Sequence, residues 1–249
     1  SDPDIYNERK DLGKLLIPQI LKSIDYDLQN SVFSYIPNSA ETAFLGILQG
    51  LEDHLSNERI QTISERSKGG AVDEKYLNQL LSFRPRVEKL VVKDDKLRTF
   101  ITADDHRNDL VAHVYDTTYE VIRKGIDNVV VIDDSIVRGT TLEKSILRIL
   151  DRLNPKKIVI VSSAPQIRFP DCYGIDMSKM NEFVAFRAVL RLLKESGLDN
   201  LIDEVYDLCI TEGLRLGAPN FVKKLYEPFA YEQVSEKIAE ITRPADLKS

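Results

Sequence analysis

The sequence predicts an α/β protein with a parallel sheet flanked by helices, followed by a helical C-terminal extension. Val129–Ile132 and Lys157–Ala164 are short apolar runs rich in β-branched residues, as in strands buried on both faces. Between them, apolar residues recur at 142, 146, 149, 150 and 153 with helical spacing and stop at Asn154-Pro155. A strand, a helix and a strand within about 35 residues form a right-handed parallel crossover unit. After Asn181 the patterns are helical throughout.

The N-terminal third supplies the elements expected to precede this unit. Leu12–Ile24 has one broad apolar face with helical spacing, and Pro18 is expected to bend or start that helix. Ser31–Ile36 is typical of a short strand that ends at the turn residues Pro37-Asn38-Ser39. Glu41–Leu55 then follows as a helix with an apolar inner face.

The remaining elements are shorter or less regular. The stretch from residue 56 to 85 is hard to interpret, apart from a loop at Ser67–Gly70. The other expected elements are a helix at Asp73–Leu81 capped by Asp73, a strand at Glu88–Lys93, a charged segment at Asp94–Asp105, a helix at Leu110–Lys124, and C-terminal helices at Phe183–Leu193, Leu201–Ile210 and Tyr231–Ile241.

The composition limits the partners and the location. The 249 residues are 43% hydrophobic and 30% charged, which is ordinary for a globular protein with a real core. The net charge is −6 without a basic stripe, so we expect no nucleic-acid partner, although a pocket could still bind a small anion. No apolar run approaches the roughly 18 residues of a membrane span, and two cysteines exclude a disulfide scaffold. We therefore expect a cytoplasmic protein with no membrane partner.

One segment carries chemistry: Val129–Thr141, which reads VVVIDDSIVRGTT. The strand delivers Asp133 and Asp134 to the carboxyl edge of the sheet, where two carboxylates suit a diol or a hydrated magnesium ion. Gly139 lets the backbone approach an anion, and the threonines and helix start that follow complete a phosphate cradle. A diol beside a phosphate indicates a ribose 5-phosphate. A single aspartate could simply cap the turn, but the whole segment after a buried strand is a more specific signal of a binding site than one aspartate.

This string resembles the signature of type I phosphoribosyltransferases that bind 5-phosphoribosyl-1-pyrophosphate (PRPP), and in detail that of the amidophosphoribosyltransferases. Other stretches similar to that family are Ser162–Met177 (SSAPQIRFPDCYGIDM), Leu97–Ile101 (LRTFI), Tyr6–Leu15 (YNERKDLGKL) and Asn181-Glu182. The resemblance extends from about residue 6 to 195 and is strongest over 128–187. It implies a type I phosphoribosyltransferase fold.

The resemblance also implies a domain organisation and a reaction. Residues 1–180 would form the phosphoribosyltransferase domain with an insertion at about 56–86, and residues 181–249 a helical extension packed on it. Ammonia would attack C1 of PRPP to give phosphoribosylamine and pyrophosphate, the first committed step of purine synthesis, with Mg²⁺ as cofactor. The ammonia would come from glutamine through a glutaminase domain, absent from this chain, in cis or in trans. A homo-oligomer is expected.

The site residues implied by the resemblance fall into three groups. Asp133, Asp134 and Arg98 would be catalytic, and Ser39, Asp133 and Asp134 would hold the metal. The turn Pro37–Ala40 corresponds to the family's pyrophosphate loop, although an ordinary turn before a helix is an equally good interpretation. The residues expected to bind PRPP are Ser39, Lys93, Asp133, Asp134, Ser135, Ile136, Val137, Arg138, Gly139, Thr140 and Thr141.

The chain departs from the family where basic residues are expected to meet pyrophosphate. Lys93, Lys96 and Arg98 stand beside the acids Asp94 and Asp95. A second basic run is replaced by residues 111–114 (VAHV), where only the histidine could carry charge. We therefore expect weaker ammonia-dependent activity than in relatives with the full basic loop, and a PRPP-binding regulatory or inactive paralogue is the alternative. A salvage enzyme that acts on a base is a weaker alternative, because it has no reason to carry the segment Ser162–Met177.

The cysteines indicate what this chain does not do alone. Some relatives hold an iron–sulfur cluster, but Asp171 occupies the matching cysteine position and Cys172 follows it, so we expect no cluster. The family's glutaminase nucleophile is a cysteine at the mature N-terminus. Residue 1 is Ser, and no cysteine precedes Cys172. We therefore expect that this chain alone cannot use glutamine.

Overall fold

The computed structural model describes residues 2–68, 73–93, 115–117, 121–171, 177–213 and 215–247, with only the backbone at 93 and 115–117. The chain forms two compact units, and each is described by itself. The first comprises Ser1–Asp134, Ile146–Ala164 and Lys248–Ser249, and the second comprises Ser135–Ser145 and Pro165–Leu247. The segment Val129–Thr141 is therefore divided between the two units, with both aspartates in the first.

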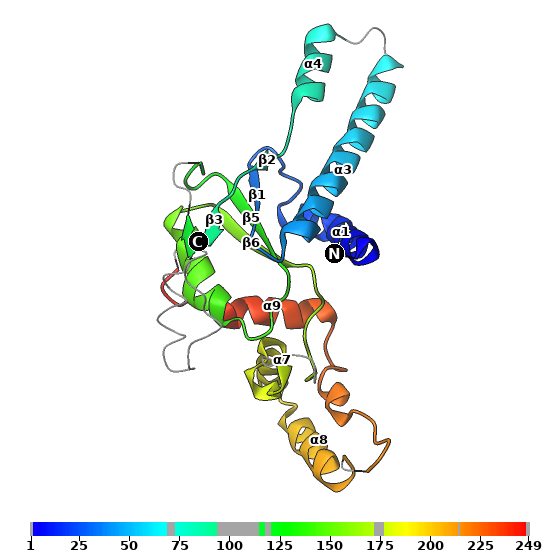
Figure 1. Ribbon diagram of the computed structural model, residues 1–249, viewed down its shortest axis with the longest axis vertical. Coiled ribbons are helices and arrows are strands. Elements are labelled where there is room, and N and C mark those ends of the chain that lie inside the picture. Colours follow the sequence, from blue (N-terminus) through cyan, green and yellow to red (C-terminus); the bar gives the residue numbers. More distant parts are fainter. Residues whose placement is uncertain are drawn as a thin grey trace. The chain divides into compact units, whose positions relative to one another are not determined.

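The first unit is built on a four-stranded parallel sheet with strand order β2-β1-β5-β6 (Figure 1). Its strands are β1 (Ser31–Tyr35), β2 (Arg86–Val87), β5 (Asn128–Asp133) and β6 (Lys157–Ser162). Val129 pairs with Ile158 and Ile132 with Val161, which confirms the expected parallel crossover unit. The α/β class with a parallel sheet is thereby confirmed.

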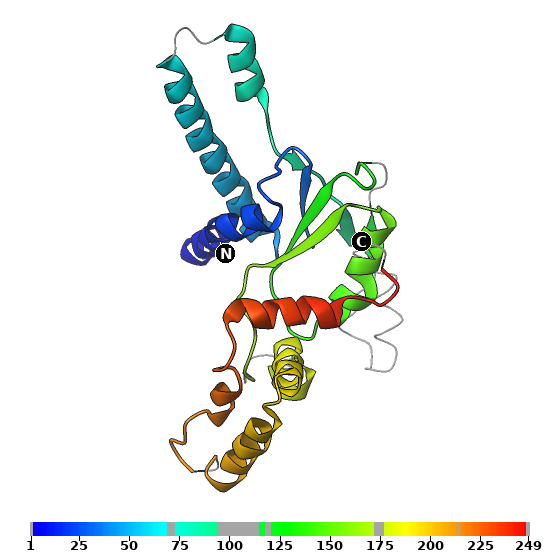
Figure 2. The same cartoon turned by 180° about the vertical axis from the view of Figure 1, so that it is seen from behind.

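Helices cover both faces of this sheet, as Figure 2 shows from behind, with α1 and α3 on one side and α6 on the other. The helices are α1 (Pro3–Leu15), α2 (Ile17–Ser23), α3 (Glu41–Ser67) and α6 (Leu147–Arg152). Alternate residues of β5 explain the arrangement: Val130 and Ile132 pack against α2 and α3, and Val129 and Val131 face the opposite side. The expected N-terminal helix is broken at Leu16, and Pro18 lies in the first turn of α2.

Helices α1 and α3 cross with their backbones in contact. A Cβ atom at Gly13 would overlap the carbonyl of Ala43, and one at Gly46 would overlap the carbonyl of Lys10. Two glycines, one on each helix, are therefore needed for this close approach.

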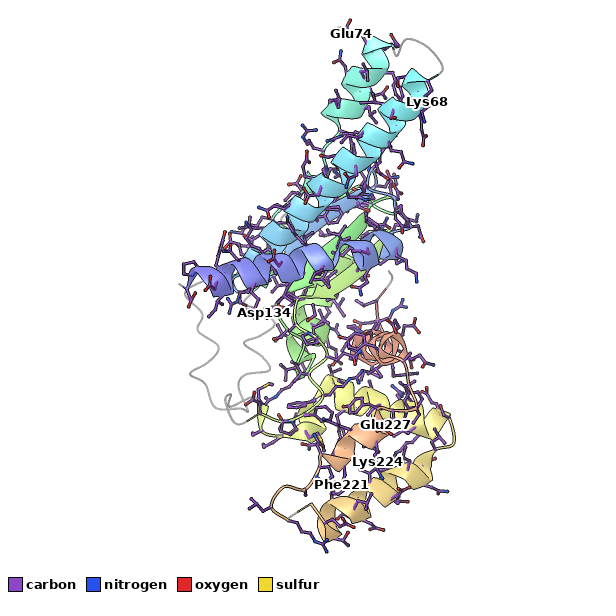
Figure 3. The ribbon with its side chains drawn as sticks, turned by 90° about the vertical axis from the view of Figure 1, so that its right-hand side faces the viewer. Lys68, Glu74, Asp134, Phe221, Lys224 and Glu227 are labelled. Atoms are coloured by element: carbon purple, nitrogen blue, oxygen red, sulfur yellow. The ribbon has the colours of Figure 1, made fainter. Side chains whose placement is uncertain are left out.

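Helix α3 extends well past its expected end at Leu55 and forms a hairpin with α4 (Glu74–Ser82). Figure 3 shows Lys68 and Glu74 at the tip of this hairpin, far from Asp134. The expected cap is confirmed, because the Asp73 side chain accepts a hydrogen bond from the backbone of Tyr76. A cavity of about 740 Å³ lies between the hairpin and the loop before β1.

A second, two-stranded antiparallel sheet pairs β3 (Val91–Lys93) with β4 (Tyr115–Thr117). The strand expected at Glu88–Lys93 is thus shorter than predicted. The helix expected at Leu110–Lys124 is wrong at residues 115–117, which form a strand, and residues 121–124 are not helical. The β-branched and aromatic residues of this stretch suit a strand as well as a helix face. The expected charged segment at 94–105, which includes the LRTFI stretch, lies outside the described residues.

A buried ion cluster ties β2 to the turn before β5. Asp127 is fully buried, and its two carboxylate oxygens each lie 2.6 Å from an arginine nitrogen, one of Arg86 and one of Arg123. Burial alone would raise the pKa of Asp127, but the hydrogen bonds and charges of Arg123 and Arg86 outweigh it and hold the pKa below its usual value.

The second unit is helical and has its own core. It contains η4 (Met180–Glu182), α7 (Val184–Glu195), α8 (Asp199–Thr211), η5 (Phe221–Leu225) and α9 (Tyr231–Thr242), which confirms the three expected C-terminal helices. Val189 and Leu193 of α7 pack with Val205 of α8 and Val234 of α9. The helix expected after the motif begins as a π-helical turn, η2 (Leu142–Ile146), before α6. Within the described ranges, no helix is long and apolar enough to cross a membrane.

Candidate functional site

The two carboxylates of the motif stand at the carboxyl end of β5, as expected. The side chain of Asp133 accepts a hydrogen bond of 2.9 Å from the backbone nitrogen of Asp134. Both backbone carbonyls are held by the chain after β6: Ser163 donates its N–H to Asp133 at 3.0 Å, and Ala164 donates to Asp134 at 2.9 Å. The Ser163 hydroxyl adds a 3.0 Å hydrogen bond to the Asp134 carbonyl. The backbone under the carboxylates is therefore fixed by the neighbouring strand.

Burial, together with the charge of Asp134, raises the pKa of Asp133 to about 7. Removing a carboxylate from water disfavours its charged form, and a second carboxylate beside it adds repulsion. A cation bound to the pair would relieve both effects. The strand end is thus suited to a positively charged ligand or to a hydroxyl donor.

The turn after β1 lies at the same sheet edge. Tyr35 pairs with Ile132, and the N–H of Ile36 donates to the carbonyl of Ile132 at 2.8 Å. The chain then turns at residues 37–40, through a cis peptide between Pro37 and Asn38, before α3 begins. Ser39 is exposed in this turn. The structure thereby brings Ser39 and the two aspartates to the ends of adjacent strands.

The loop of the motif, residues 135–141, belongs to the second unit and is fastened to the start of α7. The carbonyl of Val137 accepts a 2.8 Å hydrogen bond from the N–H of Val184, and that of Arg138 accepts one of 2.8 Å from the guanidinium of Arg187. The Arg138 side chain forms an ion pair of 2.6 Å with Glu182. Three contacts from residues 182–187 therefore set the course of the loop.

Gly139 is the residue at which the loop bends back. Its φ of +74° is a conformation that side chains oppose. A Cβ atom here would also lie 2.8 Å from Cγ2 of Thr242 on α9 and 3.4 Å from Cγ2 of Val184. Conformation and close packing both require glycine at this position.

Several expected site residues lie outside the described part of the chain. Arg98 is one of them, and the positions where the chain departs from the family, Asp94, Asp95 and 111–114, also lie outside it, as does Cys172. Lys93 ends β3, but its side chain is not described. Their expected roles stay predictions.

The contacts of Glu182 and Arg187 were not foreseen from the sequence. Asn181-Glu182 stood out only as part of the family resemblance, and nothing in the pattern singled out Arg187, which lies 49 residues from Arg138. No local spacing reports a contact between residues so far apart in the chain.

The donor set at the strand ends suits Mg²⁺ rather than a softer metal. Asp133, Asp134 and Ser39 offer carboxylate and hydroxyl oxygens, the ligands that Mg²⁺ prefers. Among the residues that the structure describes, no three His, Cys, Asp or Glu side chains gather in a metal-binding group. Mg²⁺ usually takes only one or two protein carboxylates and completes its shell with water and phosphate oxygens. The residues present therefore fit the ion.

Comparison with known proteins points to one family. The amidophosphoribosyltransferase of Pasteurella multocida is 47% identical over 81 residues, which are 32% of this chain and 16% of that protein. The amidophosphoribosyltransferase of Escherichia coli K12 is 46% identical over 76 residues, which are 30% of this chain and 15% of that protein. The resemblance to amidophosphoribosyltransferases is confirmed. The matched region spans less than a fifth of each of these relatives.

The chain was also compared with solved structures and with protein-family models. A solved glutamine PRPP amidotransferase from B. subtilis, complexed with ADP and GMP, superposes with a TM-score of 0.46 at 24% identity, covering 80% of this chain and 37% of that amidophosphoribosyltransferase. No protein-family model matches the chain.

Proposed function

We propose that this chain is the phosphoribosyltransferase part of an amidophosphoribosyltransferase, a pentosyltransferase that forms 5-phosphoribosylamine and pyrophosphate from PRPP and ammonia. The observation that carries the proposal is the end of β5, where Asp133 and Asp134 precede a loop that bends back at Gly139. A diol-binding carboxylate pair joined to an anion-binding loop matches ribose 5-phosphate. The names of the similar proteins, amidophosphoribosyltransferases, support the same reaction.

Each part of the motif has a distinct role in this proposal. Asp133 and Asp134 bind the ribose hydroxyls, and the loop from Ser135 to Thr141 binds the 5-phosphate. Ser39 binds pyrophosphate from the adjacent strand end. Ser39 and the two aspartates would hold Mg²⁺, which would supply positive charge to the pyrophosphate group.

The main requirement of the reaction is that the protein positions its two substrates. The bond from C1 to the pyrophosphate oxygen breaks and its electron pair leaves with pyrophosphate. The lone pair of ammonia forms the new C1–N bond, and the resulting ammonium group releases one proton to solvent. The transition state resembles an oxocarbenium ion, so fixing the ribose and neutralising the leaving group are the main contributions of the protein. Lys93 and Arg98 are the proposed cations for the leaving group.

The ammonia source and assembly belong to the same proposal. A glutaminase part in cis or in trans would release ammonia from glutamine, and the product would enter purine synthesis. We also propose that the protein is a homo-oligomer.

Calorimetry with PRPP and Mg²⁺ tests the binding step. The chain should bind PRPP, and the double variant Asp133→Ala with Asp134→Ala should lose that binding. Its matched control is Asp203→Ala with Asp207→Ala, two exposed aspartates of α8 that should leave binding intact. A folded Asp133/Asp134 double variant with unchanged affinity would contradict the proposed site.

Release of pyrophosphate from PRPP with ammonium chloride at alkaline pH tests the reaction. Turnover supports the transferase. Binding without turnover instead supports a PRPP-binding regulatory protein, an alternative favoured by the acids Asp94 and Asp95 at positions where the family is basic or neutral.

A further inference from the structure

We propose that Glu182 and Arg187 are positioning residues that hold the loop from Ser135 to Thr141 in the conformation that binds a 5-phosphate. This inference rests on the proposed function. It assigns the shape of the phosphate site to the start of α7, a region that the motif itself does not include. All the contacts that support it lie within the second unit.

The hydrogen bonds to two successive carbonyls fix the direction of the loop amides. Val184 and Arg187 donate to the carbonyls of Val137 and Arg138, so each carbonyl points toward a donor that α7 supplies. The peptides on either side of Arg138 are trans, and in a trans peptide the C=O and N–H groups point in opposite directions. The N–H groups of Arg138 and Gly139 therefore both point away from α7.

Two successive N–H groups on one side of a loop form a concave anion site. This arrangement, often called a nest, needs a backbone that alternates between right-handed and left-handed conformations. Gly139, with its φ of +74°, supplies the left-handed residue. The contacts of Val184 and Arg187 thus do more than fasten the loop, because they turn its donors toward the position of a bound phosphate.

Glu182 fixes the side chain of the same turn. One of its oxygens lies 2.6 Å from Nη2 of Arg138, and the other lies 3.4 Å from Nζ of Lys179. The Arg138 and Glu182 side chains are each about 30% exposed, so solvent screens this pair less than a pair on the open surface. The pair holds the Arg138 guanidinium beside η4, whereas the backbone N–H of Arg138 points away from α7.

Three variants test the role of these residues: Arg187→Ala, Arg187→Lys and Glu182→Gln. Arg187 is exposed, so its loss should leave the core intact. Arg191→Ala is the matched control, because Arg191 lies one turn further along α7 and pairs with Glu195 rather than with the loop. Calorimetry should use ribose 5-phosphate, which carries the 5-phosphate, and magnesium pyrophosphate, which does not.

Arg187→Ala loses the charge-assisted hydrogen bond to the Arg138 carbonyl, and Glu182→Gln loses the negative charge that pairs with the Arg138 guanidinium. Each variant should therefore weaken ribose 5-phosphate binding by about tenfold. Arg187→Lys should recover part of that loss, because its ammonium can still donate to the Arg138 carbonyl. The Arg191 variant, and pyrophosphate binding in all variants, should match the unmodified chain.

The outcomes separate this inference from the proposed function. If the unmodified chain binds neither ligand, both fall together. If it binds ribose 5-phosphate and the Arg187 and Glu182 variants bind equally well, only the positioning role is overturned. The positioning role is also overturned if the variants bind both ligands more weakly to the same extent and unfold at a lower temperature, because that result indicates a general structural role.

Discussion

Replacing Asp133 with asparagine should stabilise the folded chain at alkaline pH. The pKa of this carboxyl rises from 3.8 to about 7 because it is buried beside Asp134. Asparagine has nearly the same shape, stays neutral at every pH, and can still accept the hydrogen bond from the Asp134 backbone. The substitution therefore removes the cost of the buried charge and little else.

The sign and size of the effect follow from proton linkage. Below pH 4, Asp133 is protonated in both the folded and the unfolded chain and has no effect. Between pH 4 and 7 the unfolded chain loses this proton while the folded chain keeps it, so the folded state becomes less stable as the pH rises. Above pH 7 the cost reaches its full value. A pKa difference of about 3 corresponds to about 4 kcal/mol in the free energy of unfolding.

Urea denaturation at pH 4 and pH 8.5, with a chelator present, measures this difference. The Asp133→Asn variant should match the unmodified chain at pH 4 and exceed its free energy of unfolding by about 2–4 kcal/mol at pH 8.5. Asp203→Asn, an exposed aspartate on α8, should show no such pH-dependent gain. Equal stability of the two proteins at pH 8.5 would refute the reasoning.

Three other predictions concern the ion cluster, the loop and the nitrogen donor. Asp127→Ala removes the buried partner of Arg86 and Arg123, whose own side chains remain partly exposed to water, and should lower the free energy of unfolding in urea by about 2–3 kcal/mol. Because the pKa of Asp127 is lowered, its contribution to the free energy of unfolding is present above pH 4 and lost as the pH falls below that value. If the variant is as stable as the unmodified chain near neutral pH, the prediction is contradicted. Gly139→Ala, which places a Cβ against Thr242, should weaken PRPP binding in calorimetry by about tenfold or more, and an unchanged affinity would count against the loop. Incubation of the chain with glutamine, PRPP and magnesium should release no glutamate in an enzymatic glutamate assay, and any release would defeat that expectation.

The sequence was most informative where one physical cause determined the pattern. A strand covered on both faces must be apolar throughout, so Val129–Ile132 was recognisable without further information. The cap at Asp73 was predicted because capping is a local interaction. The resemblance alone linked Ser39 to the two aspartates, and the parallel pairing of β1 with β5 explains that link, since parallel strands end at the same side of a sheet.

Prediction from the sequence failed where contacts between residues far apart in the chain determine the local structure. Residues 115–117 fit either a helix or a strand by their side chains, and pairing with β3 selected the strand. The loop contacts of Glu182 and Arg187 depend on the fold of the second unit, and no spacing within the motif encodes them. The π-helical turn at Leu142–Ile146 kept the apolar spacing of an ordinary helix, so it too was invisible.

Helix α3 is one continuous element in two different environments. Its first half is fastened by the glycine crossing with α1 and by a buried face that includes Ile47 and Leu51. Beyond Leu55 only Arg59 is buried, and the partner helix α4 has no buried residue, with a cavity between them. Amide hydrogens along the same helix should therefore exchange with solvent by two routes. Those in the first half require opening of the whole unit, and those near the tip require only local fraying of the hairpin.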